Sequence, residues 1–140
     1  MISRFSRPIF AGMKSLHHIV LGKRGGIVTL PDIGAKLCLN PVERTLYRLF
    51  ISHPEGISAD NLLAHWQELC TIYALESRSD DESIRLNAME SLCADSKRVF
   101  YANVSRIKRK FVSALGSRKA APYIIKRDRN GLYRTRATLA

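Results

Sequence analysis

Four hydrogen-bonding side chains recur in one stretch of the chain at intervals that place them together on a helix: Arg98, Ser105, Arg106 and Arg109. At about 100° per residue, these positions share one face. A guanidinium group donates two parallel hydrogen bonds to an acceptor pair such as guanine O6 and N7, and a hydroxyl both donates and accepts. The residue types and their spacing therefore indicate contacts to the edges of nucleic-acid bases.

Further basic side chains suit phosphate oxygens, which position a protein on nucleic acid without reading its sequence. They are Lys97, Lys108, Lys110, Lys126, Arg127, Arg129 and Arg134. We expect these residues to contact the nucleic-acid backbone and the first four to read bases.

The charge is concentrated in the last third of the sequence. Residues 97–136 hold 13 Lys or Arg and one acid, whereas residues 41–96 hold four bases and ten acids. Residues 1–40 add six bases and one acid. A basic third behind an acidic middle makes a dipolar surface and favours a polyanionic partner. The alternative is a solvated charged face with no partner.

A helix from about residue 96 to 115 is predicted to carry the basic face. Asp95 or Ser96 is its expected cap, and Gly116 follows its end. The face opposite the arginines is apolar and consists of Phe100, Val104, Ile107, Phe111 and Leu115. Asn103 and Tyr101 flank the basic face. One side of this helix is therefore expected in the core and the other in solvent.

Two further helices are predicted before it. The first has Asn40 as its cap, Pro41 at its first position and Glu43 in the place of a capping box. The second begins after Ser58, and its apolar face is Leu62, Trp66, Leu69, Cys70 and Tyr73. Two helices joined by a short turn containing Gly56 form the scaffold of a helix-turn-helix, although unrelated helical proteins contain the same pair.

Two β-hairpins are predicted on either side of these helices. Residues 27–30 and 36–39 are β-prone runs around a turn-rich linker, and residues 15–21 offer a third strand. Residues 123–127 and 132–136 flank Asn130-Gly131, which predicts a type I′ turn. Between the second and third helices, the acidic segment 74–95 is expected to hold a loop over 76–83 and a short helix over 83–93.

This order of strands, three helices and a basic hairpin is that of a winged helix, an α+β fold. Three motifs extend the comparison: Leu39-Asn40-Pro41-Val42-Glu43, Val104-Ser105-Arg106-Ile107-Lys108-Arg109-Lys110-Phe111 and Gly131-Leu132-Tyr133-Arg134. From about Ile27 to Arg136 the chain resembles the DNA-binding effector domain of OmpR/PhoB-type response regulators. The corresponding motifs of that family are Leu-Thr-x-x-Glu, Ile-Ser-Arg-Leu-Arg-Lys-Lys-Leu and Gly-Tyr-Arg.

The chain departs from that family in three places. Leu132 is inserted in the wing and the usual Gly-x-Gly is absent, which leaves the path of the wing open. The segment 74–95 is longer and more acidic than the family's loop, which commonly contacts RNA polymerase; the resemblance implies RNA polymerase or another protein as a partner there. Residues 1–26 are too short for a receiver domain, so we expect a divergent, stand-alone effector.

The expected organisation follows from these elements. Residues 1–26 form a basic segment that is partly ordered or adds a strand, residues 27–136 form the winged helix, and residues 137–140 form a tail. No stretch is long and apolar enough to span a membrane. We expect a cytoplasmic protein without a membrane partner.

No catalytic, cofactor or metal site is expected. P-loop, dinucleotide-binding, zinc-protease and serine-hydrolase motifs are absent. The three cysteines, Cys38, Cys70 and Cys93, are isolated, which predicts small buried thiols in a reducing compartment. The sequence therefore predicts neither an enzyme nor a bound cofactor.

The histidines are interpreted separately. The adjacent His17 and His18 would point to opposite faces of a strand and do not form a chelate by themselves. His53 precedes Pro54 and is interpreted as a helix-end residue, and His65 as a solvent-side helix residue.

The leading hypothesis is a transcriptional regulator that binds double-stranded DNA. It predicts that Arg106→Ala or Arg109→Ala weakens duplex binding and leaves the fold intact. The alternative is a winged-helix interaction module that docks a protein through segment 74–95 or the first helix, without binding DNA. RNA binding is a third hypothesis, but the chain lacks an evident aromatic platform of the kind used by single-strand readers.

Overall fold

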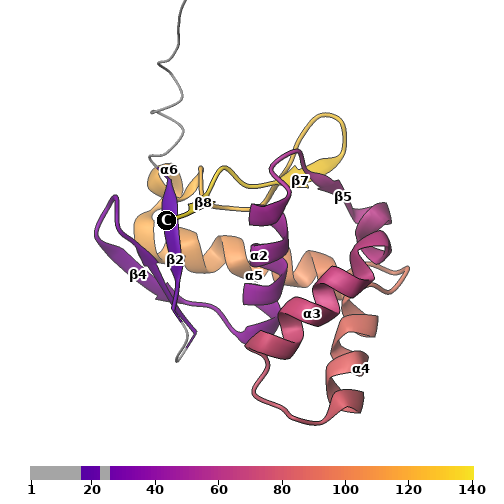
Figure 1. Ribbon diagram of the computed structural model, residues 1–140. Helices are drawn as coiled ribbons and strands as arrows, with labels where there is room; N and C mark the ends of the chain where they lie inside the picture. The colour runs from indigo at the N-terminus through magenta and orange to yellow at the C-terminus, as the bar shows by residue number, and fades with distance from the viewer. Residues whose placement is uncertain (1–16, 23–25) are drawn as a thin grey trace, which may run out of the picture.

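A four-stranded sheet lies at one end of the protein and packs against the helix of residues 98–115, and most of the other helices lie to one side of it (Figure 1). The computed structural model describes residues 17–22 and 26–140. The sheet has the order β4-β3-β2-β8, formed by β2 (His18–Leu21), β3 (Ile27–Leu30), β4 (Ala35–Cys38) and β8 (Thr138–Leu139). The first predicted hairpin is confirmed, and β2 is the expected third strand. Most of the predicted segment 1–26 lies outside the described residues.

The fourth strand of this sheet comes from the other end of the fold. β8 pairs parallel with β2, with His18 opposite Thr138 and Ile19 opposite Leu139. The expected tail 137–140 therefore contains a strand, and Ala137 is buried. Cys38, expected to be buried, is exposed because it ends the edge strand β4.

The first helix, α2 (Pro41–Ser52), begins with the predicted capping box. The side-chain Oδ1 of Asn40 accepts from the amide of Glu43 at 2.8 Å, and Oε1 of Glu43 accepts from the amide of Asn40 at 2.9 Å. These bonds satisfy amides that a helix start leaves without intrahelical partners. The buried face of α2 includes Leu46, Tyr47, Leu49 and Phe50.

The second helix is divided, unlike the single helix predicted after Ser58. Residues Ala59–His65 form a 3₁₀ helix, η1, and Trp66–Glu76 form α3. Ile57 and Ser58 pair with a later strand as β5 (Ile57–Ser58), which holds the start of this segment in extended backbone. Leu62, Leu69 and Tyr73 are buried as predicted, and Trp66 and Cys70 are partly buried.

The short helix in the acidic segment is confirmed as α4 (Glu82–Leu92), whose cap is Asp81. It is followed by α5 (Arg98–Leu115) and the single turn α6 (Ser117–Ala120). The predicted cap of α5 was wrong, because Lys97 occupies that position with φ of +59°. Its amide donates to Ala94 O at 2.9 Å, so a turn over residues 94–97 turns the chain into the helix.

The C-terminal hairpin forms, but with a different turn from the predicted one. β6 (Lys126–Arg127) pairs with β7 (Leu132–Arg134), and β7 pairs with β5, giving the order β5-β7-β6. Gly131 has φ of +82°, whereas Asn130 is not among the residues with positive φ. A type I′ turn requires positive φ at both residues, so that prediction was wrong. The Asp128 carboxylate instead accepts from the amides of Asn130 and Leu132, at 2.8 and 3.0 Å.

The core joins α2 to α5 through aromatic rings. Phe111 stacks on Tyr47 with ring centroids 5.4 Å apart and on Tyr123 at 5.9 Å. The hydroxyl of Tyr47 donates to the carbonyl of Tyr123 at 2.6 Å, which satisfies a polar group in a buried position. Asn103 was expected beside the basic face but is buried, with Nδ2 donating to Val99 O at 2.8 Å.

Across residues 17–22 and 26–140, the helices are too short or too polar for any of them to cross a membrane.

Candidate nucleic-acid interface

The solvent face of α5 carries three of the four predicted base-reading residues in exposed positions. Arg98, Ser105 and Arg109 are exposed, and so is Lys108. On the opposite side of the helix, Phe100, Ile107 and Phe111 are almost completely buried. The hydrophobic period of the sequence therefore orients the helix as predicted, and the exposed basic groups share its outer surface.

Arg106 and Lys110 lie at the edge of that surface and contact a carboxylate of their own chain. Arg106 Nε is 3.3 Å from Oε2 of Glu43, and Lys110 Nζ is 2.5 Å from Oε1. Glu43 is completely buried, whereas the two cations are 41% and 39% exposed. A buried carboxylate is costly unless it is paired and hydrogen-bonded. These two residues therefore hold α5 on the first turn of α2.

Lys97 is also paired within the chain. Its Nζ lies 2.8 Å from Oδ1 of Asp60 in η1. This hydrogen bond raises the pKa of Lys97 and lowers the pKa of Asp60. The contact joins the start of α5 to η1 and partly neutralises the Lys97 charge.

The hairpin β6–β7 presents a second group of exposed cations. Lys126 and Arg127 form β6, and Arg129 lies in the turn; all three are exposed. Arg134 differs, because its Nη2 donates to Oδ2 of Asp128 at 2.5 Å. The Leu132 amide is the main cause of a lowered pKa at Asp128, with smaller contributions from Asn130 and Arg134. Asp128 thus holds the turn through hydrogen bonds to its backbone, and it also forms an ion pair with Arg134.

Aromatic contacts fix the hairpin beside the first half of α5. Tyr133 of β7 meets Phe100 edge-on with ring centroids 5.2 Å apart, and Tyr101 at 6.4 Å. On its other side β7 pairs with β5, next to Gly56. A Cβ at Gly56 would lie 3.0 Å from Leu132 Cβ, and φ at Gly56 is +96°, so this close approach requires glycine.

The eleven predicted contacts thus divide into two groups. Four of them bind carboxylates within the chain: Lys97, Arg106, Lys110 and Arg134. The other seven are exposed on α5 or the hairpin: Arg98, Ser105, Lys108, Arg109, Lys126, Arg127 and Arg129. No protein-family model matches this chain, and neither a curated protein nor a solved structure does.

Segment 74–95 forms a different kind of surface. α3 and α4 meet along a groove whose polar lining includes Gln67, Thr71, Glu82 and Arg85. Its larger apolar lining residues are Trp66, Cys70, Tyr73, Leu75, Leu86 and Met89. Leu75 is 85% exposed and Ile84 is 55% exposed. Contiguous exposed apolar patches are typical of protein-binding surfaces.

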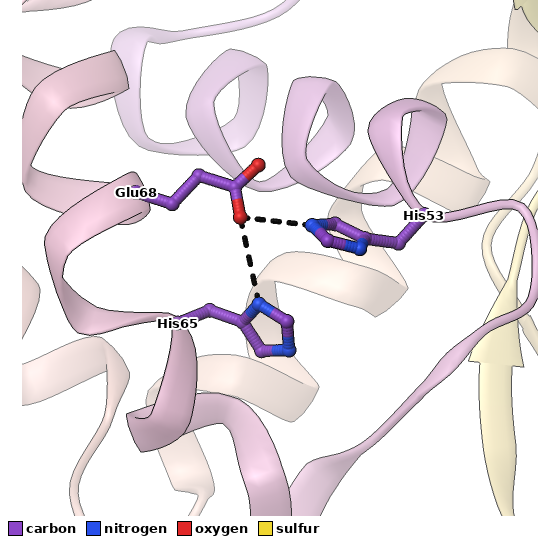
Figure 2. Close-up of side chains that lie close together, drawn as sticks. All are labelled: His53, His65 and Glu68. Atoms are coloured by element: carbon purple, nitrogen blue, oxygen red, sulfur yellow. Dashed lines mark hydrogen bonds and ion pairs between the residues drawn. The ribbon is translucent and has the colours of Figure 1, made fainter.

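The structure also brings together three side chains that sequence reasoning left apart: His53, His65 and Glu68 (Figure 2). His53 follows α2 as expected for a helix-end residue, but its ring lies between two carboxylates. Partial burial opposes the charged form of His53, and hydrogen bonds to Glu68 and Glu55 outweigh it and raise the pKa. The spacing of His65 and Glu68, three residues apart on one predicted helix, was the feature of the sequence that could have indicated part of this cluster. The turn that brings His53 to them was not readable from spacing.

Proposed function

We propose that this chain is a winged-helix protein that binds double-stranded DNA and acts as a transcriptional regulator. α2, the η1–α3 segment and α5 would be its three-helix core, and β6–β7 its wing. The observation that carries the proposal is the exposed basic surface formed by α5 and the adjacent hairpin. The arrangement of elements agrees with the order inferred from the sequence.

In this proposal α5 enters the major groove, which is about 12 Å wide and admits one helix. Arg98 and Arg109 would donate to guanine O6 and N7, and Ser105 would donate to or accept from a neighbouring base edge. Lys108 would contact a flanking phosphate. The hairpin cations Lys126, Arg127 and Arg129 would contact the backbone or the adjacent groove.

Three of the cations that are paired with carboxylates of the chain would position α5 in this mechanism. Glu43 fixes the rotation of α5 through Arg106 and Lys110, and Asp60 fixes its start through Lys97. A reading helix held in this way loses little conformational freedom when it binds. We therefore reassign Arg106, first proposed to read bases, to positioning the helix.

The test is fluorescence-anisotropy titration of random-sequence duplex DNA from low to physiological salt, with sequencing of the selected bound fraction. About five phosphate contacts give a log–log salt slope of roughly −4 to −5. Arg109→Ala is the informative variant. Arg78→Ala, an exposed arginine in the connection between α3 and α4, is the matched control.

An enriched motif that Arg109→Ala weakens and Arg78→Ala leaves unchanged supports a regulator. Strong salt dependence without any motif supports a nonspecific or architectural DNA binder instead. No binding at low salt, or equal binding by both variants, contradicts the proposed surface.

A second candidate function rests on the groove between α3 and α4. There the chain would dock a protein, RNA polymerase or another, through Leu75 and Leu86, with or without DNA. Leu75→Glu tests it without touching the basic surface. A partner that binds the native chain and the Leu75→Glu variant equally well would contradict this docking site.

A further inference from the structure

Three side chains with metal-binding atoms converge between the end of α2 and the start of α3 (Figure 2). His53 Nε2 lies 2.8 Å from Oε1 of Glu68, and His65 Nδ1 lies 3.5 Å from the same oxygen. One ligand atom from each residue lies within 4.8 Å of the other two. Within residues 17–22 and 26–140, no other group of three such side chains is this close. We propose that His53, His65 and Glu68 bind a divalent metal ion of the zinc class.

The donor atoms select the class of metal. Two imidazole nitrogens and a carboxylate are a common zinc set, with water in the fourth position. Imidazole also suits copper and nickel, whereas calcium and magnesium prefer oxygen ligands. The proposed site therefore discriminates against the abundant hard cations.

The spacing of the donors agrees with that class. Zinc–donor bonds of about 2.0–2.1 Å in a tetrahedron place the donor atoms roughly 3.3 Å apart. The distances from Glu68 Oε1 to the two histidine nitrogens, 2.8 and 3.5 Å, lie on either side of that value. The third pair of ligand atoms, from His53 and His65, lies within 4.8 Å.

A second carboxylate supports His53 from behind. Glu55 Oε2 lies 3.1 Å from His53 Nδ1, while Nε2 of the same ring faces Glu68. Metal-binding histidines commonly donate their other N–H to a carboxylate, which fixes the tautomer and the ring orientation. The orientation of His53 is thus set for Nε2 to act as the ligand.

Charge and access also favour a cation. Glu55 and Glu68 place two negative charges around two imidazoles, and a divalent ion would neutralise them. The side chains of His53, His65 and Glu68 are 22%, 24% and 37% exposed, so an ion reaches them from solvent.

The backbone brings these donors together in an unusual way. His65 ends the seven-residue 3₁₀ helix η1, and runs longer than three or four residues are uncommon. His65 and Glu68, at i and i+3, lie on either side of the change to α-helix, and both face His53 (Figure 2). A bound ion would therefore link the end of α2 to the start of α3, across the segment that contains β5.

The experiment uses the untagged full chain. Zinc chloride is titrated calorimetrically, and Co²⁺ serves as a spectroscopic probe. We expect one equivalent of metal to bind and the cobalt spectrum to be that of a tetrahedral site. The spectrum should lack a thiolate charge-transfer band, which would exclude the cysteines as ligands. Saturating zinc is also expected to raise the melting temperature, because it binds the folded state.

Variants locate the site. Glu68→Gln keeps the size of the side chain and is expected to abolish one-equivalent binding, as is His65→Ala. Glu55→Gln is expected to weaken affinity on the order of 10–100-fold. His18→Ala is the matched control, since His18 also contacts a carboxylate, Asp32 at 3.0 Å, but belongs to no such group.

The proposed site would be overturned if Glu68→Gln and His65→Ala both bound zinc with the affinity of the native chain. It would also be overturned if the native chain showed a thiolate band with Co²⁺ or bound no zinc. The same is true if His18→Ala removes the binding. The inference does not depend on DNA binding, because none of its residues lies on α5 or on the hairpin β6–β7.

Discussion

Arg106 and Glu43 are 63 positions apart in the sequence and join α5 to the first turn of α2 through Nε and Oε2, 3.3 Å apart. The same carboxylate binds Lys110 and accepts from the amide of Asn40. One buried side chain therefore caps α2 and sets the position of α5. The orientation of the proposed DNA surface depends on a residue that lies beneath it.

Arg106 and Lys110, which both contact Glu43, are expected to contribute non-additively to the free energy of unfolding. Arg106→Ala or Lys110→Ala alone leaves one cation on the carboxylate and costs about 1 kcal/mol of unfolding free energy. The double variant leaves a buried, uncompensated charge and costs about 3 kcal/mol. Urea denaturation measures both. If the cost of the double variant equalled the sum of the two single costs, Arg106 and Lys110 would not share the role of neutralising Glu43. Arg98→Ala, at an exposed position, is the control and is expected to change the free energy of unfolding by less than about 0.5 kcal/mol.

Base-reading and phosphate-contacting residues are expected to differ in the DNA assay. Arg109→Ala should cost about 1–3 kcal/mol on the selected sequence and relax the preference at one base position. Lys126→Ala should weaken all sequences alike and reduce the salt slope by about one. The comparison requires selected and random duplexes at several salt concentrations. Uniform losses in both variants would mean that Arg109 reads no base.

The hairpin turn is expected to loosen in acid. Hydrogen bonds, chiefly from the Leu132 amide, lower the pKa of Asp128 in the folded state. The stabilisation is therefore fully present above the unfolded-state pKa of about 4 and is lost as the pH falls through the lower folded-state value. Hydrogen exchange at the Leu132 amide, corrected for its intrinsic rate, measures this loss. Asp128→Asn should remove the pH dependence, and an unchanged profile in that variant would rule out Asp128 as its source.

The three thiols are expected to react at different rates. Cys38 is exposed, whereas burial raises the pKa of Cys70, and burial with a smaller effect of Cys70 raises the pKa of Cys93 to about 11. At pH 8, iodoacetamide should modify Cys93 on the order of 100-fold more slowly than an ordinary thiol. Mass spectrometry of digested protein follows each site. Equal rates at Cys38 and Cys93 would contradict the burial of the latter.

The local features of this fold were readable from the sequence because they depend on neighbouring residues. Asn40 and Glu43 specify a helix start within four positions, and the apolar period of α5 predicts which of its faces is buried and which is exposed. The hairpin around Asn130-Gly131 was found for the same reason. Its turn type was missed because the Asp128 side chain, outside the dipeptide, decides it.

Features that depend on distant partners were not readable. The pairing of Arg106 with Glu43 requires the relative placement of α5 and α2, so the sequence alone could not separate a base-reading arginine from a positioning one. The same applies to Lys97 with Asp60 and to His53 with Glu68. β8 is too short for its alternation to be recognised, and it forms because β2 offers an edge.

The parallel pairing of β2 with β8 has a consequence for biosynthesis. His18 leaves the ribosome long before Thr138, its partner, so the edge of β2 stays unpaired while all the helices are being made. Contacts between positions so distant in sequence form slowly. Until β8 pairs with it, that edge of β2 is open to strands of neighbouring nascent chains.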